Sequence, residues 1–268
     1  MKNISKLFIA IFAAAFIISC SKEETIGPND KNNIILEFDN RIGDQKLVLG
    51  TTKAKNAMGE EFTVTTLNYF VSNIALKKEN GEIVKFPNSY YLIRQADANS
   101  LNVMLKDLPA ANYTELSYTI GVDSLKSISD VAQRTGVLDP ASYGTDNMYW
   151  SWNSGYIFFK MEGNSSVIPV SAMGANQYQF HIGGYGGRAA VAPNNLRTIK
   201  FALTDVAKVR SNIAPEIHII NDISKVFNGT TQVSLAKLNS IHSPAAGTVI
   251  AENYAKGFIV DHVHNDKQ

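Results

Sequence analysis

The 268-residue chain contains a single cysteine, Cys20, and only two tryptophans and five histidines. One cysteine excludes an intramolecular disulfide and any zinc site built from several thiolates. The folded part must therefore be stabilised by its hydrophobic core alone. The chain is long enough to supply such a core, either as one large all-β domain or as two small domains.

Neither sign of charge dominates, because the chain has 25 lysines and arginines and 24 aspartates and glutamates. A chain of this balance has no extended basic surface, so we expect no nucleic-acid partner. Catalytic signatures are also missing: there is no Gly-x-Ser-x-Gly elbow, no His-Glu-x-x-His helix and no cysteine nucleophile. The acidic residues form no convincing acid and base pair. We therefore predict no catalytic residue and expect a binding protein rather than an enzyme.

The N-terminus has the pattern of a bacterial lipoprotein signal. Lys2 and Lys6 precede an apolar segment at 7–18, which is too short to span a bilayer well, and Ile17-Ile18-Ser19-Cys20 has the form of a lipobox. The pattern predicts removal of residues 1–19 and lipidation of Cys20. The alternatives are an ordinary secretory signal with a chance cysteine and a short uncleaved anchor.

A polar stretch follows the lipidation site and predicts a flexible tether over residues 20–33, in front of one domain over residues 34–266. Lys22-Glu23-Glu24 within it resembles the acidic export signal of some Bacteroidetes lipoproteins, although a solvated linker would also contain such charges. We expect an outer-membrane lipoprotein that faces either the periplasm or the cell surface.

Apolar residues of the domain recur mostly at every second position within short segments, which is typical of strands. Short helices are expected at 125–134, capped by Asp123 or Ser124, and at 222–227. Strands without alternating long helices indicate an all-β fold, an antiparallel β-sandwich or barrel-like domain with one or two short helices. The expected strands are 34–38, 61–66, 67–76, 83–86, 90–93, 115–122, 149–161, 177–182, 198–202, 216–220 and 257–264.

Both tryptophans, Trp150 and Trp152, lie two residues apart in the expected strand 149–161. Side chains two apart on a strand share a face, so the two indoles are expected side by side. Core packing is the ordinary explanation of such aromatic residues. The histidines of neighbouring strands make a functional role worth testing.

Four histidines come from three expected strands: His181 before a glycine-rich loop, His218 beside Glu216, and His262 and His264 near the C-terminus. His262 and His264 are two apart and should face one side. Imidazole is the neutral nitrogen ligand that suits copper and zinc, and the chain offers no thiolate site to compete with it. The pattern predicts a histidine metal site, whereas His242 lies in an expected loop and should be exposed.

Several strings of the chain resemble the MbnP-like copper-binding protein family, in its Bacteroidetes lipoprotein branch. The double-tryptophan and histidine-glycine strings are the specific ones. The similar strings, in chain order, are LNYFVSNIAL at 67–76, GVDS at 121–124, RTGVLDP at 134–140, MYWSWNSGYIFFKMEG at 148–163, FHIGG at 180–184, PEIH at 215–218 and DHVHND at 261–266.

The resemblance implies a β-rich extracytoplasmic domain that binds one copper ion through histidines beside a tryptophan. In well-known members that tryptophan is oxidised to kynurenine, often by a partner di-haem peroxidase. Here Trp150 or Trp152 would be the modified residue, and His181 matches the motif histidine. Ser72 stands where some members carry a histidine, so the resemblance leaves His218, His262 or His264 as further ligands.

The expected function is therefore copper acquisition, storage or delivery by a membrane-anchored protein. The alternative is a surface binding or adhesion module whose histidines are structural and whose Trp150 and Trp152 form a ligand platform. The two hypotheses differ in one geometric respect. Only the first requires the histidine nitrogens to converge within the few ångströms that a single ion spans.

Overall fold

The computed structural model describes residues 26–152, 155–170, 174, 176–187 and 190–266. The expected signal segment 1–19, Cys20 and the first part of the tether lie outside the described residues. Strand β1 begins at Lys31, earlier than the expected start at residue 34. Within the described ranges, no helix is both long enough and apolar enough to cross a membrane.

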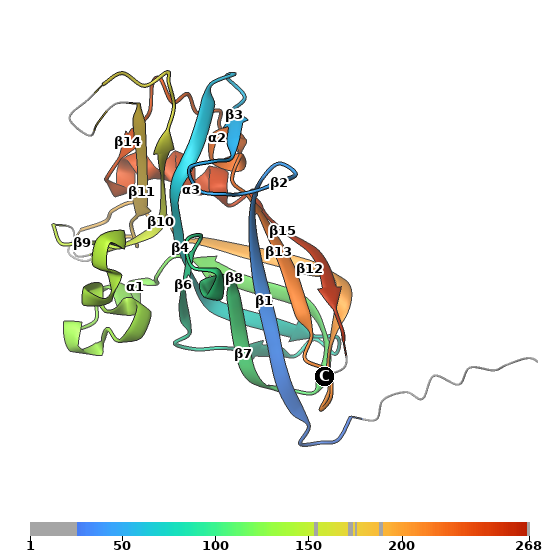
Figure 1. The fold of residues 1–268 in the computed structure, drawn as a ribbon. Helices are drawn as coiled ribbons and strands as arrows, with labels where there is room; N and C mark the ends of the chain where they lie inside the picture. Colours follow the sequence, from blue (N-terminus) through green and yellow to red (C-terminus); the bar gives the residue numbers. More distant parts are fainter. Residues whose placement is uncertain (1–25, 153–154, 171–173, 175, 188–189, 267–268) are drawn as a thin grey trace, which may run out of the picture.

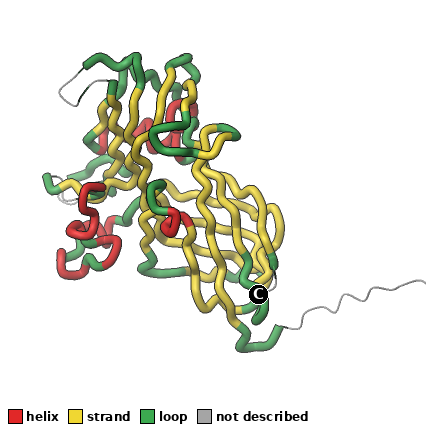
Figure 2. The backbone as a smooth tube through the Cα atoms, viewed as in Figure 1, coloured by secondary structure: helices red, strands yellow, loops and turns green. Residues whose placement is uncertain are grey.

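Two β-sheets make up most of the molecule (Figures 1 and 2). The first sheet has the order β15-β13-β1-β2, with β7 also paired to β1. Its strands are β1 (Lys31–Ile42), β2 (Gln45–Lys46), β7 (Asn102–Pro109), β13 (Glu216–Asp222) and β15 (Phe258–His264). These strands form the five-stranded sheet.

The second sheet is built around one long strand, β4, which pairs with five other strands. Its order is β12-β8-β4-β10-β11-β14, with β3, β5 and β6 also on β4 and β9 on β10. Its strands are β3 (Lys53–Lys55), β4 (Glu61–Lys78), β5 (Ile83–Lys85), β6 (Tyr90–Arg94), β8 (Ala111–Ile120), β9 (Tyr149–Trp150), β10 (Gly155–Asn164), β11 (Gln177–Gly183), β12 (Arg197–Val209) and β14 (Ser240–Ile241).

The architecture confirms the predicted β-sandwich, and the sheets do not close into a barrel. Most pairings are antiparallel, as expected, but β1 pairs with β13 and β11 pairs with β14 in parallel. Parallel pairing is possible because long stretches of chain separate the partners in each pair. These two parallel pairings determine which histidines become neighbours.

The main core lies between the sheets and follows the period of two in the sequence. In β1, Ile34, Leu36 and Phe38 are buried, while the residues between them face the other side. Aromatic rings fill the centre: Phe159 stacks on Tyr69 and on Tyr254, at centroid distances of 5.9 and 4.6 Å. This packing supplies the stability that disulfides cannot.

A second, smaller cluster of buried residues, which we call the satellite core, covers the opposite side of β4 and β10. The described residues include four 3-10 helices, and three of them follow α1: η1 (Ala98–Leu101), η2 (Val131–Gln133), η3 (Gly136–Leu138) and η4 (Pro140–Asp146). The satellite core consists of Phe70, Leu92, Val122, Leu138, Tyr143, Met148, Trp150, Tyr156, Ile157 and Phe158. It anchors Trp150.

In the part of the chain that the structure describes there are three α-helices: α1 (Ser124–Ser127), α2 (Lys225–Asn228) and α3 (Pro244–Tyr254). The helix expected at 125–134 is only the single turn α1. Asp123 caps it as predicted, but the Ser127 and Ser129 hydroxyls bond to the carbonyls of Val122 and Lys126, which competes with helix extension. Helix α3 was not predicted, because it is short and weakly amphipathic.

The expected strand 149–161 is wrong as a single element. Strand β9 ends at Trp150, Ser151 and Trp152 form a turn, and β10 runs back antiparallel with Gly155 opposite Trp150. The sequence Ser-Trp-Asn-Ser-Gly is rich in turn formers, which explains the reversal. The tryptophans therefore occupy a hairpin rather than one continuous strand.

Candidate metal centres

A cleft of about 480 Å³ brings together two histidines and both tryptophans of the chain. The imidazole rings of His181 and His242 meet edge to face, with centroids 4.5 Å apart. We call this region the cleft. It is lined by Pro140, Asn147, Tyr149, Trp150, Ser151, Trp152, Ile157, His181 and His242.

The His181 ring contacts the carboxylate of Glu162 through its Nε2 atom. It lies on β11 opposite Lys160 of β10, and its Nε2 is 2.7 Å from Oε1 of Glu162. Burial favours the neutral form of Glu162, but the hydrogen bond from His181 and the charge of Lys160 outweigh it and lower the pKa of Glu162 to about 2. Glu162 is therefore an anion that orients the His181 ring and leaves its Nδ1 available.

His242 reaches His181 through the parallel pairing of β14 with β11. Phe180 is in register with Ile241, and the next residue in each segment is a histidine, His181 on β11 and His242 just after β14. His242 is exposed and follows a strand of two residues, as the expected loop position implied. Partial burial and the neighbouring His181 lower the pKa of His242, which favours the neutral, metal-binding form of the ring.

The two tryptophans have different environments although their ring centroids are 5.3 Å apart. Trp150 is 5% exposed and belongs to the satellite core, whereas Trp152 is 63% exposed. Gly183 of the His-Ile-Gly-Gly string makes the placement of Trp150 possible. A Cβ atom there would lie 2.7 Å from the indole and 2.5 Å from the carbonyl oxygen of Tyr156.

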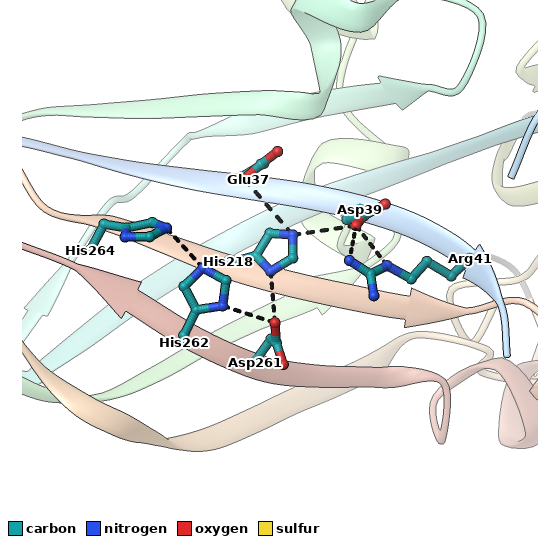
Figure 3. Close-up of polar contacts among 7 residues, drawn as sticks. All are labelled: Glu37, Asp39, Arg41, His218, Asp261, His262 and His264. Carbon is teal, nitrogen blue, oxygen red and sulfur yellow. Dashed lines mark hydrogen bonds and ion pairs between the residues drawn. The ribbon is translucent and has the colours of Figure 1, made fainter. Parts of the chain in front are cut away.

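The other three candidate histidines gather on the five-stranded sheet, on the face opposite the core (Figure 3). Nδ1 of His218 is 3.2 Å and Nδ1 of His262 is 2.8 Å from Oδ2 of Asp261. Nε2 of His262 is 2.8 Å from Nε2 of His264, which confirms that these two side chains face one side. We call His218, Asp261, His262 and His264 the sheet cluster.

Strand β1 adds carboxylates beside this cluster. Nε2 of His218 lies 3.4 Å from Asp39 and 3.9 Å from Glu37, and the guanidinium of Arg41 contacts Asp39 at 2.6 Å. Burial and the hydrogen bond with Glu37 raise the pKa of Glu216, which lies on the same face. The parallel register of β1 and β13 explains the arrangement, because it places Glu37 opposite His218.

The expectation of one pocket containing His181, His218, His262 and His264 is wrong. His181 lies on an inner strand of the ten-stranded sheet, whereas the other three lie at the β15 edge of the five-stranded sheet. Figure 1 shows β9, β11 and β14 on one side of the molecule and β13 and β15 on the other. The histidines converge in two separate groups, and His242 takes the place expected for the others beside His181.

Ser72 explains why no further ligand comes from β4. Its side chain is fully buried and its hydroxyl donates to the carbonyl oxygen of Gly121 at 2.7 Å. The hydrogen bond therefore fixes β4 to the segment that follows β8.

The profile of the MbnP family matches residues 31–243 of the chain. The chain belongs to the MbnP family. MbnP from Methylosinus trichosporium has a similar structure, with a TM-score of 0.54 and 15% sequence identity over 81% of this chain and 82% of that chain. At this identity the likeness concerns the fold. No curated protein shows significant sequence similarity to the chain.

The MbnP match contains the whole cleft but only part of the sheet cluster, since His218 lies inside the matched residues. Both tryptophans, His181 and His242 lie inside the matched residues, whereas His262 and His264 lie beyond residue 243. The cleft is thus made entirely from the part of the chain that defines the family. The sheet cluster needs the last strand, β15, which the family match does not include.

Proposed function

We propose that the protein binds copper in the cleft, with His181 and His242 as nitrogen ligands beside Trp150 and Trp152. The observation that carries the proposal is the contact of the two imidazole rings in a cleft that also holds both tryptophans. The resemblance described above, a histidine copper site next to a tryptophan, agrees with this arrangement.

The donor groups fit copper. A metal-bound histidine commonly donates its other ring N–H to a carboxylate, which fixes the ring orientation and raises its basicity. Glu162 provides this contact for Nε2 of His181. Imidazole nitrogens suit copper, and a cleft with two of them leaves the remaining positions to another donor.

The protein's role would be to carry copper as cargo, for acquisition, storage or delivery, rather than to catalyse a reaction. A lipid on Cys20 would anchor it to the bacterial outer membrane, facing the periplasm or the cell surface. Radiolabelled or mass-tagged fatty acid should be incorporated into the protein in a bacterial host. Unchanged incorporation in Cys20→Ser would contradict the anchor.

Copper titration of the metal-free protein tests the binding proposal. Because both tryptophans lie in the cleft, bound copper should quench most of the intrinsic fluorescence at one equivalent. Loss of even an outer-shell partner costs about 10–100-fold in metal affinity, so His181→Ala and His242→Ala should each lose more than about 100-fold.

His262→Ala is the matched control, because it removes a histidine outside the cleft. It should leave the full extent of the quenching unchanged. Absence of quenching in the wild type, or equal quenching in His181→Ala and His242→Ala, would overturn the proposal. Circular dichroism of each variant establishes that the fold is retained.

Oxidation of Trp150 or Trp152, with a di-haem peroxidase as partner, belongs to the same proposal. Trp152 is accessible from solvent and contacts Trp150, so an external oxidant has a route to both rings. Protein purified from its native host should have an intact mass that differs from that of the sequence, by one oxygen gained and one carbon lost for kynurenine, and peptide mapping should assign the change to one indole. An unmodified mass in the presence of the peroxidase would contradict it.

The alternative of a binding or adhesion module is favoured by one observation, the exposed Trp152 ring packed on Trp150. In that case glycan or peptide binding would depend on Trp152 and be independent of copper. Trp152→Ala should then abolish binding on a ligand array, whereas His181→Ala should not. The convergence of His181 with His242 supports copper as the first proposal.

A further inference from the structure

The sheet cluster is organised by a β-bulge. Strand β15 pairs His262 with His218 and Val260 with Ile219, so Asp261 is the extra residue between two regular pairs. Bulges re-aim side chains and are frequent next to functional sites. Here the bulge directs Asp261 and His262 to the same face as His218, where all three side chains meet (Figure 3).

The three side chains have the separations of metal ligands. One atom of each of His218, Asp261 and His262 lies within 4.8 Å of the others. Zinc–nitrogen and zinc–oxygen bonds of about 2.0–2.2 Å in a tetrahedron place ligand atoms about 3.4 Å apart. The observed distances from Asp261 Oδ2, 3.2 Å to His218 Nδ1 and 2.8 Å to His262 Nδ1, would need to open by about 0.2 and 0.6 Å.

Both imidazoles also have a partner at the nitrogen that faces away from Asp261. Nε2 of His218 is 3.4 Å from Asp39, and Nε2 of His262 is 2.8 Å from Nε2 of His264. Such partners fix the ring orientation and tautomer of metal-bound histidines. His264 is therefore better placed as the outer partner of His262 than as a ligand.

The charge around the sheet cluster favours a cation. Four carboxyl groups, those of Glu37, Asp39, Glu216 and Asp261, lie near the histidines, and Arg41 is the cation in contact with Asp39. One arginine cannot balance this set. Asp261 and His264 are exposed, so an ion can approach from solvent and keep a water ligand.

We propose that His218, Asp261 and His262 form a second metal site, independent of the copper cleft, that binds a divalent ion of the zinc type. Two imidazoles and one carboxylate leave a fourth tetrahedral position for water or a further ligand. The donor set also accepts Cu²⁺, which binds such ligands more tightly than Zn²⁺. His264 and Asp39 orient the two histidine ligands.

Isothermal titration of the copper-free protein with Zn²⁺ tests this site. We expect one Zn²⁺ per chain, more than about 100-fold weaker binding in His262→Ala, and about 10–100-fold weaker binding in His264→Ala, as for the loss of an outer partner. Asp261→Asn keeps the side-chain shape and should also weaken binding. These three positions are exposed or half-exposed, so the variants should fold, unlike replacements of buried His218.

His242→Ala is the matched control from the cleft and should bind Zn²⁺ as the wild type does. The inference is overturned if the wild type takes up no Zn²⁺, if His262→Ala binds it normally, or if His242→Ala abolishes it. A larger loss in His264→Ala than in His262→Ala would overturn the ligand assignment. A calorimetric titration of His181→Ala with Cu²⁺ should show one remaining copper site, and Zn²⁺ should compete for that site.

The two proposals can fail separately. Zn²⁺ does not quench tryptophan as copper does, and both tryptophans lie in the cleft, so fluorescence reports the cleft while the heat of Zn²⁺ binding reports the sheet cluster. Zn²⁺ binding without copper quenching would reject the proposed function and keep the second site. Copper quenching without Zn²⁺ binding would keep the proposed function and reject the second site.

Discussion

The cleft and the sheet cluster are built by different means. In the cleft, side-chain packing does the positioning: Trp150 is part of the satellite core, Gly183 makes room for it, and Glu162 fixes His181. In the sheet cluster, backbone pairing positions the side chains, through the register of β13 with β15 and the bulge at Asp261. A packed site should be sensitive to stability, whereas a register-defined edge site should tolerate substitution.

The two regions also place their carboxylates differently. Glu162 lies behind His181, where it orients a ring without blocking its other nitrogen. Asp261 lies between His218 and His262, where it contacts both rings directly. A carboxylate behind an imidazole acts as an outer partner, whereas one between two imidazoles is positioned as a ligand.

Replacing the buried tryptophan should have the largest effect on stability. Trp150→Ala removes a ring that is 5% exposed and should lower the free energy of unfolding by about 3–5 kcal/mol. Trp152→Ala, the neighbouring control at 63% exposure, should change it by no more than about 0.5 kcal/mol. Urea denaturation measures both. Equal effects would show that the satellite core does not hold the cleft.

Acid should weaken the cleft through Glu162. Its pKa falls from 4.5 unfolded to about 2 folded, so it stabilises the native state above pH 4.5, and this contribution is lost as the pH falls toward 2. A shift of this size corresponds to at most about 3 kcal/mol, and solvent screening of the partly exposed carboxylate lowers this figure. Urea unfolding of the metal-free protein between pH 6 and 3 should show a steeper decline in the wild type than in Glu162→Gln.

The matched control for the acid experiment is Asp261→Asn in the sheet cluster. Its carboxylate is exposed, so its contacts with His262 and His218 are screened by solvent. Its pH profile should follow that of the wild type. If stability depended less on pH in Asp261→Asn than in Glu162→Gln, Asp261 rather than Glu162 would be the carboxylate that contributes more to acid sensitivity.

Adding one methyl group at Gly183 should shift the side chains of the cleft without removing any of them. Gly183→Ala forces its Cβ against the Trp150 ring and the Tyr156 carbonyl, and such overpacking typically costs about 1–3 kcal/mol. The tryptophan emission maximum should shift as Trp150 moves. Gly59→Ala has open space around its Cβ but a φ of +78°, so it should cost some stability through backbone strain and leave the emission unchanged. An unaltered spectrum in Gly183→Ala would show that the indole is not held by this contact.

The smallest effect is expected in the sheet cluster. His264→Ala in the metal-free protein should change the free energy of unfolding by no more than about 0.5 kcal/mol, since the side chain is exposed on an edge strand. Thermal unfolding without metal measures this directly. A loss above about 1 kcal/mol would mean that the His262–His264 contact is structural.

Much of the fold was predictable because its information is local. The alternation of Ile34, Leu36 and Phe38 and that of Leu116, Tyr118 and Ile120 predicted buried strand faces, and the structure confirms them. The same reasoning failed at residues 149–161, where strand-forming aromatic residues flank a turn, and at α3, where the periodicity is weak. Periodicity identifies faces and says little about chain reversals.

The sequence by itself determined the chemistry available: imidazoles and two indoles, no disulfide, and a core that must stabilise the fold alone. It also determined that His262 and His264 face one side, because alternation is a property of any strand. Only the tertiary structure decided how the histidines are grouped. Two parallel pairings, β11 with β14 and β1 with β13, and one bulge in β15 are long-range events that no local pattern encodes, and they place His242 beside His181 and Asp261 between His218 and His262.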